Sequence, residues 1–274
     1  MLRKIVMMAA MTALVAGLVS AQTVDEIIAK NNAARGGLDR IKAVKSSRIV
    51  GKGFSQGMEL PMAILWKRPN RVRMDMTIQG KVMVQAFDSA NGWMIMPFMG
   101  STDPEKMTAE DTKEISQRAD FDGELVDYQK KGHKVELVGK EDVDGAPAYK
   151  LKVTLKNGDI EYVFIDAATN LELKSVSKRK SQGAEIEIET FSSDYKLVDS
   201  VLVPHAMESK VKGQTVMQLT FDTVKFNVPV ADSAFVMPPK KAVDTTAKAP
   251  SDSAAVTPAT KPSDKKVEGK KGKP

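Results

Sequence analysis

The chain of 274 residues contains no cysteine. Disulfide bonds, zinc thiolates and cysteine nucleophiles are therefore excluded, and so is the lipid-modified cysteine that anchors bacterial lipoproteins. The stability of the protein has to come from a hydrophobic core. The roughly 220 residues between the two ends of the chain are enough for one sizeable domain or two small ones.

Histidine is almost as scarce, since His133 and His205 are the only two. They provide neither a two-histidine metal site at helical spacing nor a serine-histidine-acid triad, and both are interpreted as residues at loop edges. Phosphate-binding glycine loops, nucleophile elbows and dinucleotide fingerprints are also missing. The sequence predicts no catalytic residues, no metal site and no cofactor, and we do not expect an enzyme.

Aromatic residues make up only 5% of the chain. A pair of carboxylates could cleave glycosidic bonds, but such sites are usually lined by aromatic rings. We interpret the acidic residues considered for this role as parts of solvated faces and turns: Asp75, Asp88, Asp120, Asp122, Glu141 and Asp142.

Both ends of the chain differ in composition from its middle. Residues 1–21 combine Arg3 and Lys4, an apolar run and a Val19-Ser20-Ala21 cleavage site, which predicts a secretory signal peptide and a mature chain that begins at Gln22. The alternative, a membrane anchor, is disfavoured because an apolar run of about 15 residues is short of the roughly 20 that span a bilayer. We expect an exported, soluble protein of the periplasm.

The basic charge belongs to these ends. Residues 240–274 carry nine lysines against four acidic residues, so the formal charge of +6 leaves about −1 for the middle of the chain. A nucleic-acid-binding face is therefore not supported. The Lys/Pro/Ala-rich segment is predicted to be disordered, either as a solvating tail or as an arm that contacts anionic surfaces.

Residues 22–239 follow the alternation of an antiparallel β-sheet. Short turns at Gly57, Gly80 and Asn157-Gly158 separate the expected strands, which lie at about 45–55, 59–67, 70–79, 81–88, 92–98, 133–143, 147–156, 159–166, 171–181, 184–194, 201–211 and 214–226. The predicted fold is mainly β (α+β), with one large, strongly curved sheet.

Helices are predicted at two places. Thr23 and Glu26 form a capping box for a helix that ends at Gly36-Gly37. Between residues 103 and 128, Asp103-Pro104 predicts one helical turn, and Thr108 with Asp111 predicts a second helix. The apolar stripe of this insert is thin, which indicates helices that lie on the sheet.

Methionine is unusually frequent, with 16 residues in the chain. Many of them fall between residues 58 and 99, and thioether side chains adapt to apolar ligands of varied shape. An ordinary sheet core that uses methionine is the alternative interpretation.

Several local motifs resemble the periplasmic lipoprotein-carrier and outer-membrane lipoprotein-sorting (LolA-like) family. They include Ala34-Arg35-Gly36-Gly37-Leu38, Trp66-Lys67-Arg68-Pro69-Asn70-Arg71, Gly139-Lys140-Glu141 and Val203-Pro204-His205. The resemblance implies an unclosed β-barrel covered by a few helices, with acyl chains held on its concave face. It also implies lipid or an acylated lipoprotein as cargo, an inner-membrane donor and an outer-membrane acceptor.

The predicted ligand-binding residues line this groove or contact it from the helical lid. They are Leu60, Met62, Ile64, Trp66, Met74, Met76, Met94, Met96 and Phe98 in the groove, with Phe121 and Leu125 in the lid. A shift of one residue in any strand would move its side chains to the other face. A lipid- or partner-sensing regulatory protein of the same fold, and an uncharacterised hydrolase, are the alternatives.

Overall fold

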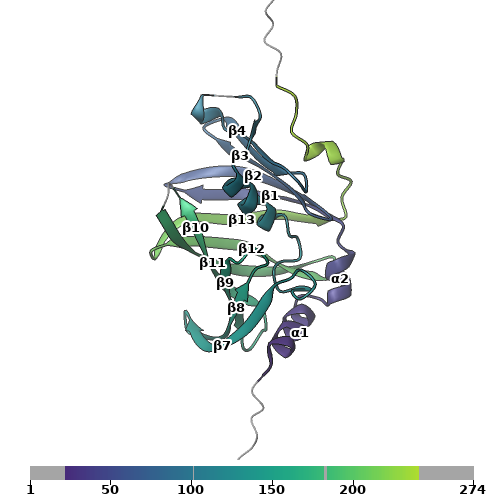
Figure 1. Cartoon of the computed structure of the whole chain (residues 1–274), viewed down its shortest axis with the longest axis vertical. Coiled ribbons are helices and arrows are strands. Elements are labelled where there is room, and N and C mark those ends of the chain that lie inside the picture. The colour runs from purple at the N-terminus through teal and green to yellow at the C-terminus, as the bar shows by residue number, and fades with distance from the viewer. Residues whose placement is uncertain (1–21, 101, 182–183, 241–274) are drawn as a thin grey trace, which may run out of the picture. The chain divides into compact units, whose positions relative to one another are not determined.

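The structure is a computed structural model that describes residues 22–100, 102–181 and 184–240. The predicted signal peptide and residues 241–274 of the predicted tail lie outside the described residues. Within these ranges the chain forms a single 13-stranded antiparallel sheet (Figure 1). The predicted fold class, a mainly β protein with one large unclosed sheet and few helices, is confirmed.

The order of the strands in the sheet is β6-β5-β4-β3-β2-β1-β13-β12-β11-β10-β9-β8-β7. Neighbouring strands are mostly consecutive in the sequence, and β1 pairs with β13 to join the first and second halves of the chain. The strands are β1 (Ser46–Ser55), β2 (Met58–Lys67), β3 (Arg71–Ile78), β4 (Lys81–Phe87), β5 (Gly92–Ile95), β6 (Glu105–Lys106), β7 (Lys134–Val143), β8 (Ala146–Thr154), β9 (Ile160–Asp166), β10 (Glu172–Ser181), β11 (Ala184–Val198), β12 (Val201–Val211) and β13 (Gln214–Phe226). The edges of the sheet are β6 and β7, so it does not close.

The α-helices cover one face of the sheet, which we call the inner face (Figure 1). They are α1 (Val24–Ala34), α2 (Leu38–Ala43) and α3 (Ala109–Arg118). Two 3-10 turns, η1 (Pro97–Met99) and η2 (Asp232–Ala234), lie outside these helices. The predicted capping box is confirmed, because the Thr23 hydroxyl accepts from the backbone N–H of Glu26 and the Glu26 carboxylate accepts from that of Thr23. Thr108 caps α3 in the same way by accepting from Asp111.

Two apolar clusters lie between the helices and the inner face. One joins Ile27 and Ile28 of α1 to strands β8 and β9, where Leu151, Val163 and Ile165 are fully buried. The other joins Ile115 of α3 to β1–β4 through residues such as Ile49, Ile64 and Val72. The two clusters occupy opposite halves of the same curved sheet.

The outer face of β3–β5 is covered by the end of the described chain. Phe235 is fully buried there, and its carbonyl oxygen accepts a 2.6 Å hydrogen bond from the Trp93 indole. Arg73 donates to the carbonyl oxygen of Ala234, and the carboxylate of Asp232 pairs with Lys67 and Arg71. The segment after β13 is thus part of the folded unit.

Four details of the sequence prediction are wrong. Residues 103–106 contribute the short strand β6 instead of a helical turn, and residues 96–98 leave the sheet and enter η1. The segment between α3 and β7 consists of turns, because Gly123 and Gly132 adopt positive φ angles there. His205 is also not at a loop edge, since it is buried within β12.

Candidate functional site

The inner face of β1–β5 carries a continuous apolar surface set by strand register. Met62 lies opposite Met76, Ile64 opposite Met74, and Trp66 opposite Val72. Met74 is opposite Gln85, which in turn lies opposite Met94. Because residues directly opposite each other in a sheet point to the same face, these side chains share one surface.

The structure therefore brings most of the predicted groove residues together. Leu60, Met62 and Ile64 are buried, whereas Trp66, Met74, Met76 and Met94 remain half-buried although they face the interior. Met96 lies just beyond β5, and Phe98 lies in η1 with an exposed fraction of 40%. Phe98 is thus on the rim of the apolar surface.

Helix α3 lies across this surface and bridges the two halves of the sheet. A side chain at Gly92 of β5 would meet Met107, Thr112 and Ile115, so the glycine allows α3 to approach the strand closely. At its other side α3 is held by an ion pair from Glu114 to Arg179 of β10, and by contacts of Lys113 and Gln117 with Asp159. Helix α3 is a cover held by polar contacts on one side and apolar contacts on the other.

The two residues predicted to contact ligand from the lid pack against aromatic rings and against the α1 cluster. The Phe121 ring lies 6.1 Å from both the Trp66 and the Phe226 ring, and Leu125 belongs to the α1 cluster. The neighbouring Asp122 accepts two hydrogen bonds, of 2.7 and 2.6 Å, from the Arg68 guanidinium. This segment anchors the cover to the sheet.

Between the two apolar clusters the inner face carries small hydroxyl side chains beside Ile186 and Ile188. Thr190 lies opposite Ser175 on one side and Ser209 on the other, while Ser177 lies opposite Glu161. The serine and threonine residues named here, together with Ser192, form what we call the hydroxyl floor.

A cavity of about 280 Å³ lies beside Ser192, at one end of this floor. It is walled by α1, by the segment that follows α3, and by β10–β12. Its lining residues are Asn31, Arg35, Asp120, Phe121, Asp122, Gly123, Glu124, Leu125, Glu172, Ser192, Tyr195, Pro204 and Met207. We call it the central cavity.

Glu124 and Glu172 line the cavity, Glu161 of β9 interacts with Glu124, and none of the three forms an ion pair among the described residues. Burial, reinforced by the charge of Glu124, raises the pKa of Glu172 to about 8 and that of Glu161 to about 7. Burial also raises the pKa of Glu124. Such groups exchange protons near neutral pH, which marks them as functional candidates.

One further group at the central cavity responds to the same enclosure. Burial and the charge of Glu172 raise the pKa of Tyr195, whose hydroxyl donates to the carbonyl oxygen of Glu172.

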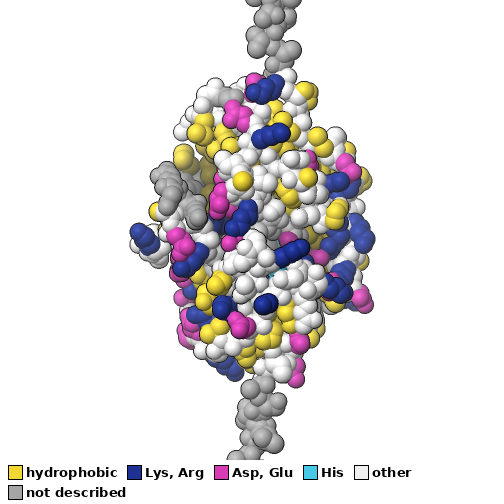
Figure 2. All heavy atoms as spheres, in the orientation of Figure 1, with side chains coloured by type: hydrophobic (Ala, Val, Ile, Leu, Met, Phe, Trp, Pro, Cys, Tyr) yellow, Lys and Arg dark blue, Asp and Glu magenta, His cyan; other side chains and the backbone are white. Residues whose placement is uncertain are grey.

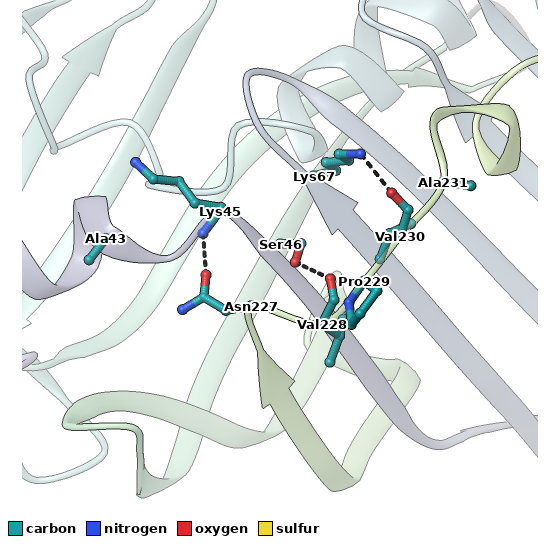
Figure 3. A pocket seen from close by; sticks show the side chains of 9 residues that line it. All are labelled: Ala43, Lys45, Ser46, Lys67, Asn227, Val228, Pro229, Val230 and Ala231. Carbon is teal, nitrogen blue, oxygen red and sulfur yellow. Dashed lines mark hydrogen bonds between the residues drawn. The ribbon is translucent and has the colours of Figure 1, made fainter.

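A larger and more open hollow, of about 800 Å³, lies beside the start of β1 (Figure 3). Its hydrogen bonds join the segment after β13 to the sheet: Lys45 N–H to Asn227, the Ser46 hydroxyl to Val228, and Lys67 to Val230. These contacts attach the segment after β13 to the sheet, so they have a structural role. We therefore place the functional site at the inner face and not at this hollow.

The acidic residues considered for glycoside cleavage all have structural contacts. Asp75 pairs with Arg73, Asp120 with Lys131 and Glu141 with Lys150, while Asp122 binds Arg68. Asp88 and Asp142 accept backbone hydrogen bonds within turns. Basic and acidic side chains are interspersed over the face viewed in Figure 2.

The residues described here include no helix long and apolar enough to cross a membrane. In the same ranges no three His, Cys, Asp or Glu side chains are grouped as metal ligands.

No protein-family model and no curated protein sequence matches the chain. Similar folds occur among solved structures. A DUF1329 family protein from Desulfovibrio piger aligns with a TM-score of 0.54 at 13% identity, over 79% of this chain and 98% of that one. A LolA superfamily protein from Nitrosomonas europaea aligns with a TM-score of 0.53 at 11% identity, over 79% and 98%. A domain assigned to outer-membrane lipoprotein sorting, from Vibrio parahaemolyticus, aligns with a TM-score of 0.53 at 13% identity, over 77% and 94%.

These likenesses define the fold class. The expected resemblance to the lipoprotein-sorting family is confirmed at the level of the fold, because the aligned structures cover 77–79% of this chain at TM-scores of 0.53–0.54. At these identities the likeness does not extend to individual residues of the site, whose role has to be argued from this chain alone.

Proposed function

We propose that the protein is a soluble periplasmic carrier that holds the acyl chains of lipoproteins or lipids on its inner face and moves them toward the outer membrane. The observation that carries this proposal is the methionine-rich surface on β2–β5. Its side chains point inward beneath α3, yet Met74, Met76 and Met94 keep part of their surface unburied. An ordinary core would bury them.

Acyl chains fit such a surface because each methylene that leaves water contributes roughly 0.8 kcal/mol. Methionine side chains adapt to a flexible chain at little cost in packing. Few polar contacts are needed, which agrees with the absence of an assembled catalytic triad in the sequence. The fold of a lipoprotein-sorting domain and of a LolA superfamily protein gives independent support.

Export through the predicted signal peptide would bring the carrier to the periplasm, where acylated lipoproteins travel between membranes. An inner-membrane donor and an outer-membrane acceptor would then be its partners. The cover formed by α3 shields bound chains from water, and its polar contacts with Asp159 and with Arg179 of β10 can break more readily than an apolar core.

The test is native mass spectrometry of the mature chain, purified gently from the periplasm and followed by extraction of bound molecules. Met76→Lys places a charge on the inner face, while Thr77→Lys changes the adjacent residue of β3 that points to the opposite face. We expect co-purified acyl lipid or acylated peptide in the parent and in Thr77→Lys, and its loss in Met76→Lys. A parent protein that carries no lipid and binds none in titration contradicts the proposal.

A further inference from the structure

The two ends of the sheet differ in the chemistry of their turns. In a row of antiparallel strands every second turn falls at the same end. One end therefore carries the turns at residues 56–57, 79–80 and 212–213, together with η1 after β5. It lies on the left in Figure 1, away from α1 and α2, whereas turns at the opposite end contain Asp88 and Asp199. We call it the apolar end and define it by residues 54–58, 78–82, 96–100 and 211–216.

Large apolar side chains are exposed at the apolar end. Met99 of η1 is 79% exposed, and Phe98 beside it also reaches solvent. Phe54 at the end of β1 is exposed as well. Val216 of β13 is exposed next to it, because the hydroxyl of Ser55 donates a hydrogen bond to the carbonyl oxygen of Val216. Exposed apolar side chains that gather in one region mark a surface that binds a partner or a membrane.

The charges at the apolar end have one sign. Lys81 and Lys212 are its only charged residues. Both are exposed, and neither side chain forms an ion pair or hydrogen bond with another described residue. Glu59, the next residue along β2, is already paired with Lys52 at 2.8 Å. The apolar end therefore presents unpaired positive charge, which is complementary to an anionic surface.

The apolar end also continues the methionine-rich surface of the inner face. Met58 alternates in β2 with the same spacing as Leu60 and Met62, so its side chain extends the inner face to the turn. On the other side, β5 leads from Met94 into η1. Apolar side chains thus connect the exposed end of the sheet with its covered inner face.

We propose that the apolar end docks on a lipid bilayer that contains anionic phospholipid, with Phe98 and Met99 entering the head-group region and Lys81 and Lys212 contacting lipid phosphates. The inference goes beyond the proposed function, because docking does not require a lipid on the inner face. For a carrier, it defines the end of the molecule at which acyl chains enter and leave.

A bilayer fits these features because the exposed side chains come from separate turns. Proteins bind the membrane interface by burying apolar side chains at the boundary between head groups and acyl chains, and basic residues add attraction to anionic lipids. Flexible methionine side chains suit a fluid surface that has no fixed shape. The acidic turns at the opposite end would be repelled by the same bilayer.

The experiment is sedimentation of the full mature chain with two kinds of vesicle, one of phosphatidylcholine and one of equal parts of phosphatidylcholine and phosphatidylglycerol. We expect the parent to bind the mixed vesicles more tightly, with an affinity that falls as salt is added. Residues 240–274, which are rich in lysine, are present in every variant. Differences between variants therefore report the apolar end.

Substitutions assign the binding to particular side chains. Met99→Ser should weaken binding to the mixed vesicles about tenfold, since an exposed methionine would no longer leave water. Lys81→Gln should weaken it about fivefold and should change binding to phosphatidylcholine little. The control Leu197→Ser removes an apolar side chain that is 68% exposed near the turn at Asp199, and it should bind as the parent does.

Insertion can be measured directly because the chain has no cysteine, so a single introduced thiol takes a dye specifically. A polarity-sensitive dye on Met99→Cys should shift its emission to shorter wavelength when mixed vesicles are added. The same dye on Leu197→Cys should not respond. Responses of equal size at both positions, or a response at Leu197→Cys alone, would overturn the proposed orientation.

Further outcomes distinguish other occupants of this surface. Binding that Met99→Ser and Lys81→Gln leave unchanged would assign vesicle attachment to another segment and overturn the inference. A parent that binds no vesicles but forms a dimer, which Met99→Ser dissociates, would make the apolar end an interface between two copies. Loss of docking leaves the carrier proposal standing if acyl lipid still co-purifies, and docking without co-purified lipid contradicts the carrier proposal alone.

Discussion

The replacement Glu172→Gln tests the electrostatics of the central cavity without any ligand. The pKa of Glu172 is raised from its ordinary value of 4.5 to about 8, because its environment disfavours the charged form. The folded state then holds a proton that the unfolded state releases between about pH 4.5 and pH 8. The contribution of this group to stability is fully present below pH 4.5 and is lost as the pH rises through 8.

The magnitude follows from the size of the shift. Each pKa unit corresponds to about 1.36 kcal/mol, so a shift of this size acting alone would amount to several kcal/mol. Glu172 is half-buried and interacts with Glu124 and Glu161, so we reduce the expected effect to about 1–3 kcal/mol. Glutamine does not ionise and should avoid this loss.

Urea unfolding at a series of pH values from 5 to 9 gives the free energy of unfolding of both proteins. At pH 5 we expect similar stabilities, and at pH 9 we expect Glu172→Gln to be about 1–3 kcal/mol more stable than the parent. The exposed Glu187→Gln should follow the parent at every pH. Parallel curves for Glu172→Gln and the parent, or a variant that is less stable at pH 9, would refute the reasoning.

Other predictions concern the elements that hold the inner face in place. Phe235→Ala should lower the free energy of unfolding by about 3–5 kcal/mol, because this ring is fully buried on the outer face. In thermal unfolding followed by Trp93 fluorescence, the transition should move to a lower temperature. The control Val236→Ala, at an exposed position, should change stability little. Asp122→Asn should cost about 1–3 kcal/mol by removing the charge partner of Arg68, as measured by chemical unfolding; an unchanged midpoint would show that the Arg68 contact is not stabilising. Gly92→Val should push α3 away from β5 and speed hydrogen exchange at residues 109–118, with the rest of the sheet as an internal control.

Much of the strand pattern could be predicted from local signals, as particular residues show. Asn157-Gly158 marks the turn between β8 and β9, and the alternation of Met74 and Met76 with charged neighbours gave the correct face of β3. These signals are local, so they do not depend on the order of strands in the sheet. Strand β6 was missed because a two-residue strand has no periodicity, and Glu105 and Lys106 are both exposed.

The central cavity could not be predicted because it depends on contacts between distant parts of the chain. Glu172 alternates with other residues as a solvent-facing carboxylate would, and only its position beneath α1 and the turn at Glu124 encloses it. The hydroxyl floor also requires the register of three strands. Alternation of serine and threonine with larger residues at 175–177 and 190–192 is the one signal in the sequence that points to it.

The measurement that most directly tests the account is photo-crosslinking of a phospholipid that carries a diazirine on its acyl chain, with the modified peptides identified by mass spectrometry. We predict crosslinks to inner-face residues of β2–β5, including Met62, Met74 and Met94, and their suppression by an excess of unlabelled lipid. Crosslinks confined to outward-facing positions such as Val82 and Leu197, or an absence of saturable crosslinks, would contradict the claim that the inner face holds acyl chains.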